Sequence, residues 1–550
     1  MNTAAVTTAL AGMLASSALA QAPSVTGVLN NYSYTLPSLP NYGIAQGSIF
    51  AIFGTNLAAQ PAAQTPPLQV TVAGVTVDVT VNGTTTRPLL YYVSPSQIDA
   101  VLPSATPAGT GTVSVTNGQG ASATFPIVVV SRAFGLATAN SGAGQALGFD
   151  ASNGGALFGF MQAVNPGEIL ELWGTGLGPV AGDATDVAVV PAPQVFIGGM
   201  EARALYAGRS SYTGLDQINV QVPAGMSGCY VSVVVQTGTY VSNFATLPVA
   251  ASGRACSDSW NPLPAGVFQK ISQTGTANIG VVQVTQTTGP NYDALPTYAT
   301  HDAALGSFVK LTAAQLSEGA SASGAVVVSP GSCVVNFATA GAPLLPPLGL
   351  FQFAYLSAGP ELYGAGPEGD LTMPPLTPLA GIPVYGNFTL FVPPSGGNFN
   401  FGNTSGGADV GSFNVSLQVP PAWTWVDWQN MNSIFAIPRA GGITLDWTGG
   451  DPSTYVSVNG VSYGSMNGGT DLFVLGDFTC LAPTSAGAFT VPPVVLQALP
   501  VSYNAPISQN LLSSTLSLSY LSAPAPFAAE GLDAAWAQSQ VTYSILVSYQ

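Results

Sequence analysis

Two stretches of the chain repeat one pattern at a constant spacing. Residues 47–57 read GSIFAIFGTNL and residues 167–177 read GEILELWGTGL, while QIDAVLP at 97–103 returns as QINVQVP at 217–223. The second copy carries the residue numbers of the first plus 120 at both ends (167 against 47, 223 against 103). A duplicated unit of this size predicts two tandem modules, each with its own hydrophobic core.

The composition restricts the kinds of partner. Of the 550 residues 47% are hydrophobic, enough for a core in every module, whereas only 6% are charged. An ordinary globular protein has about 25% charged residues. Eight Lys and Arg stand against 24 Asp and Glu, which gives a net charge of −16. Nucleic acids and anionic lipids require a basic surface. The composition therefore excludes nucleic acid, disfavours anionic lipid, and predicts a surface of uncharged polar side chains.

The first twenty residues are typical of an export signal. They are small and apolar and end in Ala18-Leu19-Ala20, a small-x-small cleavage site before Gln21. We expect 1–20 to be a signal peptide, although no Lys or Arg precedes the apolar run. No later segment approaches the roughly 18 apolar residues of a membrane span. We therefore expect a protein that is secreted, or held at the cell surface or in the periplasm.

The cysteines fit an oxidising compartment. There are four of them, Cys229, Cys256, Cys333 and Cys480, and four cysteines allow three pairings. We favour Cys229–Cys256, because it would tie a strand of the second module to the segment that leaves it, and hence Cys333–Cys480. A metal site is disfavoured, because the sequence has no CxxC pair and no histidine near a cysteine. We expect neither a metal nor a cofactor.

Short runs of alternating apolar and polar residues dominate the chain. Residues 70–81 alternate like half-buried strands and are followed by Asn82-Gly83, a hairpin turn. About seven such runs in roughly 100 residues are what an immunoglobulin-like sandwich requires. Residues 137–167, rich in Gly, Ala and Asn, read as a linker or an elaborated hairpin.

We predict an all-β protein with two tandem immunoglobulin-like β-sandwiches and a larger β-sandwich region. The first module spans 24–131 and the second 132–256. The β-rich region spans 260–550, as one large or two small sandwiches. The only helices that the sequence predicts are short ones at 312–317 and 528–536.

The duplicated segments resemble a known family. The apolar strand at 47–57, the hairpin after it, Ser94-Pro95-Ser96-Gln97-Ile98 and Leu102-Pro103 are similar to IPT/TIG domains. The whole stretch 25–256 is similar to an uncharacterised C-terminal module repeated in secreted proteins of soil bacteria. The resemblance covers a little under half of the chain. It implies immunoglobulin-type sandwiches and brings no catalytic residues with it.

We expect two pairs of matching residues in the repeat to have structural roles. Gly54 and Gly174 follow the apolar strand, where we expect glycine to allow a positive φ at a sharp exit. Gln97 and Gln217 each precede an alternating strand, and we expect their side chains to bond loop backbone. Neither pair indicates a catalytic site.

Candidates for catalysis are few. His301 is the only histidine, so a Ser-His-Asp triad would need it, with Asp302 or Asp293 as its partner. Glycoside hydrolysis needs two carboxylates. The candidates for that pair are Glu361, Glu368, Asp370, Asp427 and Asp446. Exposed turn acids and a solvated His-Asp pair are the simpler interpretations, so we expect no enzyme.

The tryptophan cluster is the sharpest local feature. Trp423 and Trp425 fall on one side of a regular strand and Trp428 on the other. Flat rings with polar edges stack on sugars or anchor partner proteins, but the same rings also fill sandwich cores.

Three functions follow in order of preference. The first is a structural or adhesive extracellular protein whose modules act as spacers and whose partner is a surface protein. The second is a glycan-binding protein that uses the tryptophan cluster. The third is a glycan-cleaving enzyme.

Overall fold

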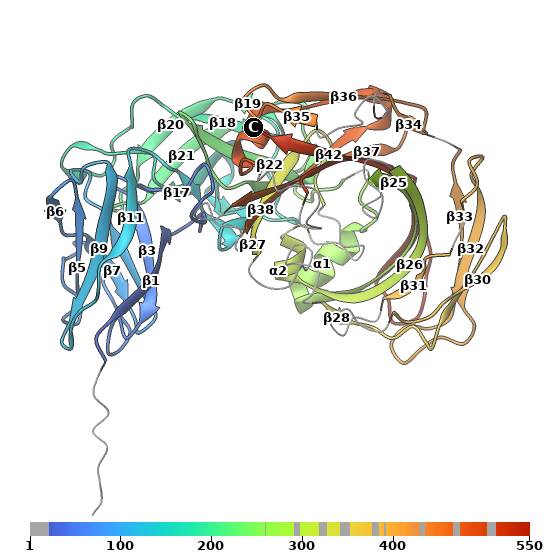
Figure 1. Cartoon of the computed structure of the whole chain (residues 1–550), viewed down its shortest axis with the longest axis horizontal. Helices are drawn as coiled ribbons and strands as arrows, with labels where there is room; N and C mark the ends of the chain where they lie inside the picture. The colour runs from blue at the N-terminus through green and yellow to red at the C-terminus, as the bar shows by residue number, and fades with distance from the viewer. Residues whose placement is uncertain are drawn as a thin grey trace, which may run out of the picture.

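Strands dominate the residues that the structure describes, and the helices among those residues are short (Figure 1). The computed structural model describes residues 21–258, 260–290, 298–317, 319, 327–340, 353–376, 384–389, 392–421, 423–426, 428, 435–465, 473–502 and 513–550. The all-β class is confirmed. Within those residues no helix is long and apolar enough to cross a membrane. The expected signal peptide, 1–20, lies outside them.

The first immunoglobulin-like sandwich is built from two sheets that face each other. Its strands are β1 (Ser24–Asn30), β2 (Ile44–Ala45), β3 (Ile49–Thr55), β4 (Ala62–Ala63), β5 (Thr76–Val81), β6 (Thr84–Thr86), β7 (Leu89–Val93), β8 (Gln97–Val101), β9 (Gly109–Asn117), β10 (Gly120–Ala121) and β11 (Phe125–Val130). One sheet has the order β1-β3-β8-β7-β4, and the other has β2-β11-β9-β5-β6 with β10 beside β9. Because side chains alternate along a strand, Val77 and Val79 point inward and share a buried cluster with Phe50 and Ile52.

The second sandwich repeats this plan with its own core. Its strands are β12 (Gly135–Leu136), β13 (Thr138–Asn140), β14 (Ala143–Ala146), β15 (Gly148–Asp150), β16 (Ala156–Leu157), β17 (Ile169–Thr175), β18 (Gln194–Ile197), β19 (Met200–Ala202), β20 (Ala204–Arg209), β21 (Asp216–Gln221), β22 (Gly228–Thr237), β23 (Tyr240–Val241) and β24 (Ala245–Val249). The sheets run β16-β15-β17-β21-β20, with β12 beside β17, and β13-β14-β24-β22-β18-β19, with β23 beside β22. Residues 137–167 therefore form short strands of this sandwich and not a free linker.

The repeat holds at the level of strand register. Ile52 faces Ile98 across β3 and β8, and Leu172 faces Ile218 across β17 and β21, both shifted by 120 positions. The hydroxyls of Ser122 and Ser242 each accept a backbone N–H, from Val115 and Val235 respectively. The two copies are thus one fold built twice, with separate cores.

The glycines after the apolar strands serve a different purpose from the one predicted. Gly54 and Gly174 do not have a positive φ; the left-handed residues are Asn56 (φ 55°) and Gly176 (φ 106°), two positions later. A Cβ on Gly54 would collide with the backbone of Ser24 in the neighbouring strand, and one on Gly174 would collide with Phe134. Glycine is needed here because an edge strand passes close to it.

The two glutamines also differ from expectation. Gln97 Nε2 donates to Asp99 Oδ1 at 2.7 Å, and Gln217 Nε2 donates to Asn219 Oδ1 at 2.9 Å. The prediction that they bond loop backbone is wrong. Residues two apart in a strand lie on one face, so the nearest acceptor is the side chain two positions on.

A buried ion pair lies close to the contact between the two sandwiches. Arg209 and Asp216 are 2.6 Å apart, and their side chains are 2% and 0% exposed. Asp216 Oδ2 also accepts the backbone N–H groups of Gly176 and Leu177, at 2.7 and 2.8 Å. The chain approaches closely here, since a Cβ on Gly47 would lie 2.7 Å from the Arg209 guanidinium.

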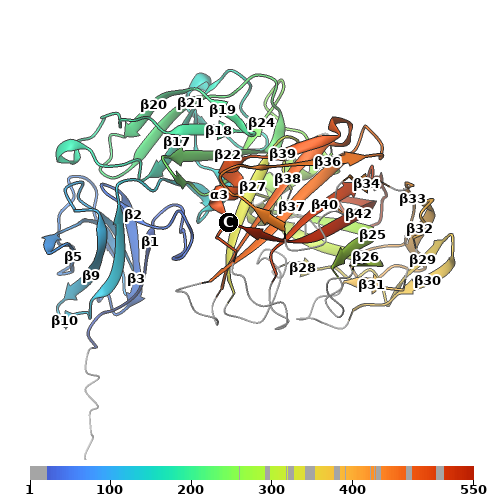
Figure 2. The same ribbon diagram turned by 45° about the horizontal axis from the view of Figure 1, so that its top comes forward.

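The C-terminal region is organised around one large sheet. Its strands are β25 (Thr276–Pro290), β26 (Tyr298–Thr312), β27 (Cys333–Ala340), β28 (Ala354–Tyr355), β31 (Tyr385–Asn387), β35 (Phe435–Ile437), β37 (Tyr455–Ser465), β38 (Phe473–Pro483), β40 (Thr515–Leu521), β41 (Ala525–Pro526) and β42 (Ala534–Tyr549). This 11-stranded sheet has the main order β27-β38-β37-β40-β42-β25-β26-β28. Figure 2 shows its long strands running side by side.

Two smaller sheets cover different parts of the large one. The four-stranded sheet contains β29 (Leu362–Gly366), β30 (Gly369–Met373), β32 (Gly397–Asn403) and β33 (Phe413–Val419), and the three-stranded sheet contains β34 (Thr424–Trp425), β36 (Ile443–Thr448) and β39 (Ala488–Val491). The first packs Phe399 and Phe401 toward Val282 and Phe308 of β25 and β26. The second, with α3 (Pro493–Ala498), covers β37, β38 and β40.

The helices were predicted in part. The one expected at 312–317 is present as α2 (Ala313–Ser317). The one expected at 528–536 is wrong, because this segment is a turn that enters β42. A helix that the sequence did not predict, α1 (Ala265–Thr274), buries Val267, Phe268 and Ile271 beneath the large sheet.

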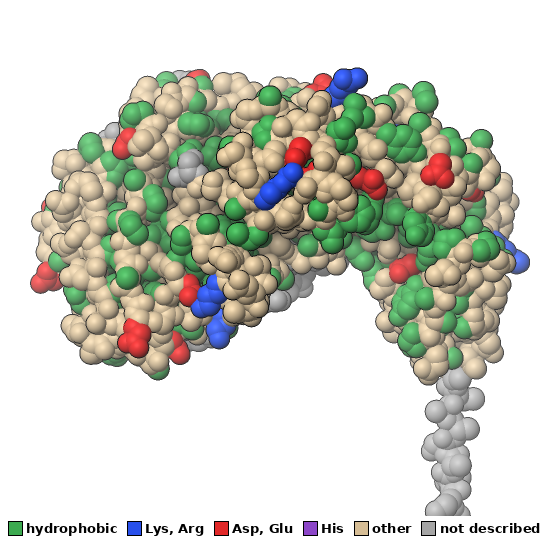
Figure 3. Space-filling view, turned by 180° about the vertical axis from the view of Figure 1, so that it is seen from behind, with side chains coloured by type: hydrophobic (Ala, Val, Ile, Leu, Met, Phe, Trp, Pro, Cys, Tyr) green, Lys and Arg blue, Asp and Glu red, His purple; other side chains and the backbone are tan. Residues whose placement is uncertain are grey.

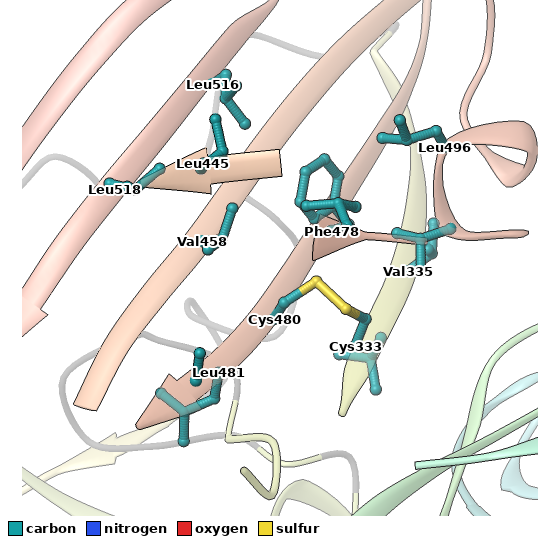
Figure 4. Packing of buried hydrophobic residues seen from close by; sticks show 14 of the residues in the cluster. Cys333, Val335, Leu445, Val458, Phe478, Cys480, Leu481, Leu496, Leu516 and Leu518 are labelled. Carbon is teal, nitrogen blue, oxygen red and sulfur yellow. A yellow bond between two sulfur atoms is a disulfide. The ribbon is translucent and has the colours of Figure 1, made fainter. Parts of the chain in front are cut away.

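Both disulfides follow the favoured pairing. Cys229 is bonded to Cys256 and Cys333 to Cys480. The second bond joins residues directly opposite each other on β27 and β38. Figure 4 shows it lying against the same apolar cluster as Val335, Phe478 and Leu481.

The second sandwich is fused to the C-terminal region and is not a free spacer. Tyr230 of β22 shares a buried cluster with α1, and its hydroxyl donates to the Leu316 carbonyl at 3.0 Å. Val234 and Phe244 join the cluster under α3. Strand β22 is therefore buried on both faces over nearly its whole length.

We expect Asp216→Ala to destabilise the second sandwich by about 3–5 kcal/mol, because it leaves the Arg209 charge buried without a partner. The measurement is urea unfolding followed by hydrogen exchange of peptides from β17 and β21. Asp78→Ala is the control, since Asp78 pairs with Arg87 at the surface and such pairs are worth about 1 kcal/mol or less. Equal losses of stability in the two variants would contradict the conclusion that the Arg209–Asp216 pair is buried and stabilises the second sandwich.

Candidate functional site

A cleft lies where the two covering sheets meet over the large sheet, and we call it the seam cleft. Its volume is about 390 Å³, within the roughly 300–1,000 Å³ usual for ligand pockets. The lining residues come from the large sheet, from the segment between β31 and β32, from the end of β33 and from the entry to β34. They are Gln286, Thr288, Thr300, Asp302, Val392, Pro393, Pro394, Val419, Pro420, Trp423, Val541 and Tyr543.

The hairpin of β25 and β26 supplies the polar wall. Gln286 lies opposite Asp302, and Thr288 opposite Thr300, with the two threonine hydroxyls 2.8 Å apart. These four residues share a face with Val284 of the core, because residues two apart point the same way. The cleft thus begins where the inward face of the hairpin changes from apolar to polar.

Strand β42 and the entry to β34 supply the aromatic wall. Val541 lies beside Gln286 and Tyr543 beside Thr288 in the parallel pair of β25 and β42. The side chains of Val541 and Tyr543 therefore lie on the same face of the sheet as those of Gln286 and Thr288. The Tyr543 hydroxyl donates to the Trp423 carbonyl at 3.1 Å, and the two ring centroids are 5.6 Å apart. Tyr543 therefore holds Trp423 against the large sheet.

The segment at Val392 closes one side. Its N–H donates to Asp302 Oδ2 at 2.8 Å, and its carbonyl accepts from Gln286 Nε2 at 3.2 Å. Pro393 and Pro394 follow and line the cleft. Asp302 and Gln286 thus fix this segment with one carboxylate oxygen and one amide group.

Two of the residues that line the cleft each carry a buried polar atom that has no hydrogen-bond partner. The two atoms are Asp302 Oδ1, an acceptor, and Trp423 Nε1, a donor. A buried polar group without a partner costs about 1–3 kcal/mol. Hydroxyl groups placed beside these atoms would donate to Asp302 Oδ1 and accept from Trp423 Nε1, and would recover that free energy.

Two of the three tryptophans are core residues, which was the favoured interpretation, and the position of Trp428 differs from the prediction. The side chains of Trp423 and Trp425 are each 1% exposed, so neither offers a ring face for stacking on a sugar. Trp423 instead borders the cleft, while Trp425 fills the core. Trp428 does not lie on the opposite side: its ring is 5.1 Å from Tyr543, which also contacts Trp423. The regular alternation fails because β34 has only two residues.

The catalytic candidates that the structure describes form no common site. His301 and Asp302 are neighbours on β26 and therefore point to opposite faces. Glu361, Glu368, Asp370 and Asp446 are exposed. Asp293 and Asp427 lie outside the described residues. Of the described residues that line the seam cleft, Asp302 is the one carboxylate.

The surface of the protein carries few charged side chains. Figure 3 shows a few charged side chains scattered over a mostly uncharged face. Across the described part of the chain, no group of three or more His, Cys, Asp or Glu side chains is placed to hold a metal ion. The seam cleft offers hydroxyls, an amide, a carboxylate and an indole N–H, which are groups that recognise neutral, hydroxyl-rich ligands.

Comparisons with known proteins give only a distant likeness. No protein-family model matches the chain, and no curated protein matches it either. Among solved structures, it is similar to the mixed-linkage glucan utilization locus protein SGBP-B of Bacteroides ovatus, in complex with a mixed-linkage heptasaccharide. The identity is 13% and the TM-score 0.19 over 49% of this chain and 65% of that one, slightly under two thirds of its length.

Two further structures are similar at the same level. SGBP-B from a complex xyloglucan utilization locus in Bacteroides uniformis is 10% identical over 84% of this chain and all of that chain, with a TM-score of 0.17. Domains 5–6 of the S-layer protein SbsC are 10% identical over 42% of this chain and all of that one, with a TM-score of 0.15. Values this low say nothing about ligand or activity.

A second unusual carboxylate lies outside the seam cleft. Asp477 on β38 is buried opposite Asn336, whose Nδ2 donates to Oδ2 at 3.4 Å, while Oδ1 has no partner. Burial raises the pKa of Asp477 to about 6. The folded state therefore holds this proton more tightly than the unfolded chain. Stability is gained below the unfolded pKa and lost as the pH rises through about 6.

We expect Asp477→Asn to stabilise the C-terminal region by about 2 kcal/mol at pH 7.5 and to have little effect near pH 4, since an amide carries no charge to bury. Hydrogen exchange of β38 peptides across this pH range measures the effect. Burial also raises the pKa of Asp216 to about 6, so only the difference between variant and wild type is informative. Glu530→Gln, at an exposed turn, is the control; a pH-independent gain would contradict the interpretation.

Proposed function

We propose that this protein is an exported, non-catalytic binding protein whose seam cleft takes part of a neutral polysaccharide. One observation carries the proposal: two residues that line the same cleft, Asp302 and Trp423, carry a buried acceptor (Oδ1) and a buried donor (Nε1) that have no partner within the protein. A sugar hydroxyl donates one hydrogen bond and accepts others. Vicinal hydroxyls of one ring would therefore meet both needs.

The shape and the remaining groups support the same ligand class. The volume of about 390 Å³ is in the lower part of the range for small-molecule sites, which suits one or two sugar rings. Thr288, Thr300 and Gln286 add neutral hydrogen-bonding groups, and the Tyr543 ring adds an aromatic surface. The lining has no Lys or Arg among its described residues, so an acidic sugar would lack a counter-charge.

The N-terminal half fits a presenting role in this proposal. We propose that 24–131 and 132–256 are IPT/TIG-like modules and that 260–550 is the binding region. The second sandwich packs on that region through Tyr230, Val234 and Phe244, so the pair would hold the cleft at a fixed place relative to the N-terminus. The two disulfides agree with an oxidising destination outside the cytoplasm.

We expect the full-length protein to bind neutral glycans on an array and to bind the matching soluble polysaccharide in calorimetry. Asp302→Asn keeps one acceptor oxygen but removes the charge and the free carboxylate oxygen. We expect it to weaken binding by about ten-fold, equivalent to 1.4 kcal/mol. The double variant Thr288→Ala/Thr300→Ala tests the polar wall without altering the core and should weaken binding in the same direction.

Glu201→Gln is the matched control for the charge, because Glu201 is exposed on β19 and far along the chain from the cleft. It should leave the affinity unchanged. Absence of binding to every neutral glycan tested, or equal affinity in wild type and both cleft variants, would refute the proposal. The substitution Trp423→Ala is not informative, because it empties a core position.

A further inference from the structure

A second cleft lies at the joint between the two immunoglobulin-like sandwiches, and we call it the joint cleft. Asn31, Tyr32, Tyr91 on β7 and Asp99 on β8 line it from the first sandwich, and Tyr212 lines it from the loop between β20 and β21 of the second. Its volume is about 250 Å³. That is below the roughly 300–1,000 Å³ of sites for drug-sized ligands and suits one small group.

The joint cleft is held in place by hydrogen bonds between the sandwiches. The Tyr91 hydroxyl donates to the Thr213 carbonyl at 2.8 Å. The Thr175 hydroxyl accepts the Ile49 N–H at 2.8 Å and donates to the Gly214 carbonyl at 2.6 Å. The loop that carries Tyr212 is therefore fixed against β3 and β7, and little ordering would be needed on binding.

Two of the residues that line this cleft, Asn31 and Asp99, supply acceptor oxygens. Asn31 Oδ1 is buried and has no partner. Asp99 is a carboxylate whose pKa is raised by burial and lowered in part by the hydrogen bond from Gln97. The Tyr91 hydroxyl proton is already used in the bond to Thr213. In the lining of the seam cleft, by contrast, the buried atoms without a partner include a donor, Trp423 Nε1.

The duplication supplies an internal comparison for Asp99. The matching residue in the second copy is Asn219, and it accepts the same hydrogen bond from Gln217 that Asp99 accepts from Gln97. The fold therefore needs an acceptor at this position but not a negative charge. Burying a carboxylate costs free energy, so the charge of Asp99 points to something outside the fold that benefits from it.

We propose that the joint cleft binds a small organic cation, an ammonium or guanidinium group, with Asp99 as the counter-charge and Tyr32, Tyr91 and Tyr212 as aromatic walls. Cations are attracted to the faces of aromatic rings, and acceptor atoms suit N–H donors. The Arg209 charge near this joint is neutralised by Asp216 at 2.6 Å, so it does not repel the ligand. The site is independent of the glycan proposal.

Calorimetry on the full-length chain tests this with three probes: methylammonium chloride, methylguanidinium chloride, and a blocked Gly-Lys-Gly peptide. Binding of the free cations alone assigns a free amine as the ligand, and tighter binding of the peptide assigns a cationic side chain of a partner. We expect Asp99→Asn, which copies Asn219, to weaken binding by about ten-fold. No binding of any probe, or equal binding by Asp99→Asn, would overturn the proposal.

Two further variants separate a binding role from a structural one. Tyr212 is 55% exposed, so Tyr212→Ala should fold normally and still lose affinity for the cation. Asp78→Asn removes a surface carboxylate of the same sandwich and should leave the affinity unchanged. The variant Asp302→Asn should also bind the cation as the wild type does, so failure of the glycan site and failure of this site are distinguishable.

Discussion

Burial of the large sheet on both faces decides how the C-terminal half is built. Along β25, Val282 and Val284 point to the four-stranded sheet, while Ile279 and Val281 point to α1 and the second sandwich. Strands β25 and β42 pair in parallel over ten residues, and parallel pairs occur where both faces are covered. The second sandwich therefore serves as one of the covers, which explains why it is fused to this region.

The same constraint produces the seam cleft. Two covering sheets cannot continue into each other, because the large sheet twists beneath them, and a seam remains between β33 and β34. The side chains facing the seam change from apolar to polar at Gln286 and Asp302, where the cover ends. A site at this place combines a rigid, packed floor with polar groups that the core has no need for, which is how pre-formed ligand sites are usually built.

What the sequence could and could not predict follows from the range of the interactions. The duplicated strands were predictable, because alternation and the turn at Asn82-Gly83 are local, and the disulfide pairing followed from chain order. Helix α1 had a signal that was missed, since Gly275 adopts the left-handed conformation (φ 81°) typical of a helix end. No sequence signal predicts that Asp302 and Trp423 line the same cleft, because this cleft exists only after β26, β42 and β34 have been brought together.

Six of the eight basic side chains form ion pairs or hydrogen bonds within the protein, and this limits the positive charge that is available for ligands. Of the eight Lys and Arg, Arg87, Arg209, Arg254 and Lys270 are paired with carboxylates, and Arg132 and Arg439 donate to backbone carbonyls. Arg254 alone joins Asp150 and Glu168. The 24 acids outnumber these cross-links, so the field outside the molecule is negative. Anionic ligands are repelled at long range, whereas neutral sugars are unaffected and cations are attracted, which agrees with the ligand classes that we propose for the two clefts.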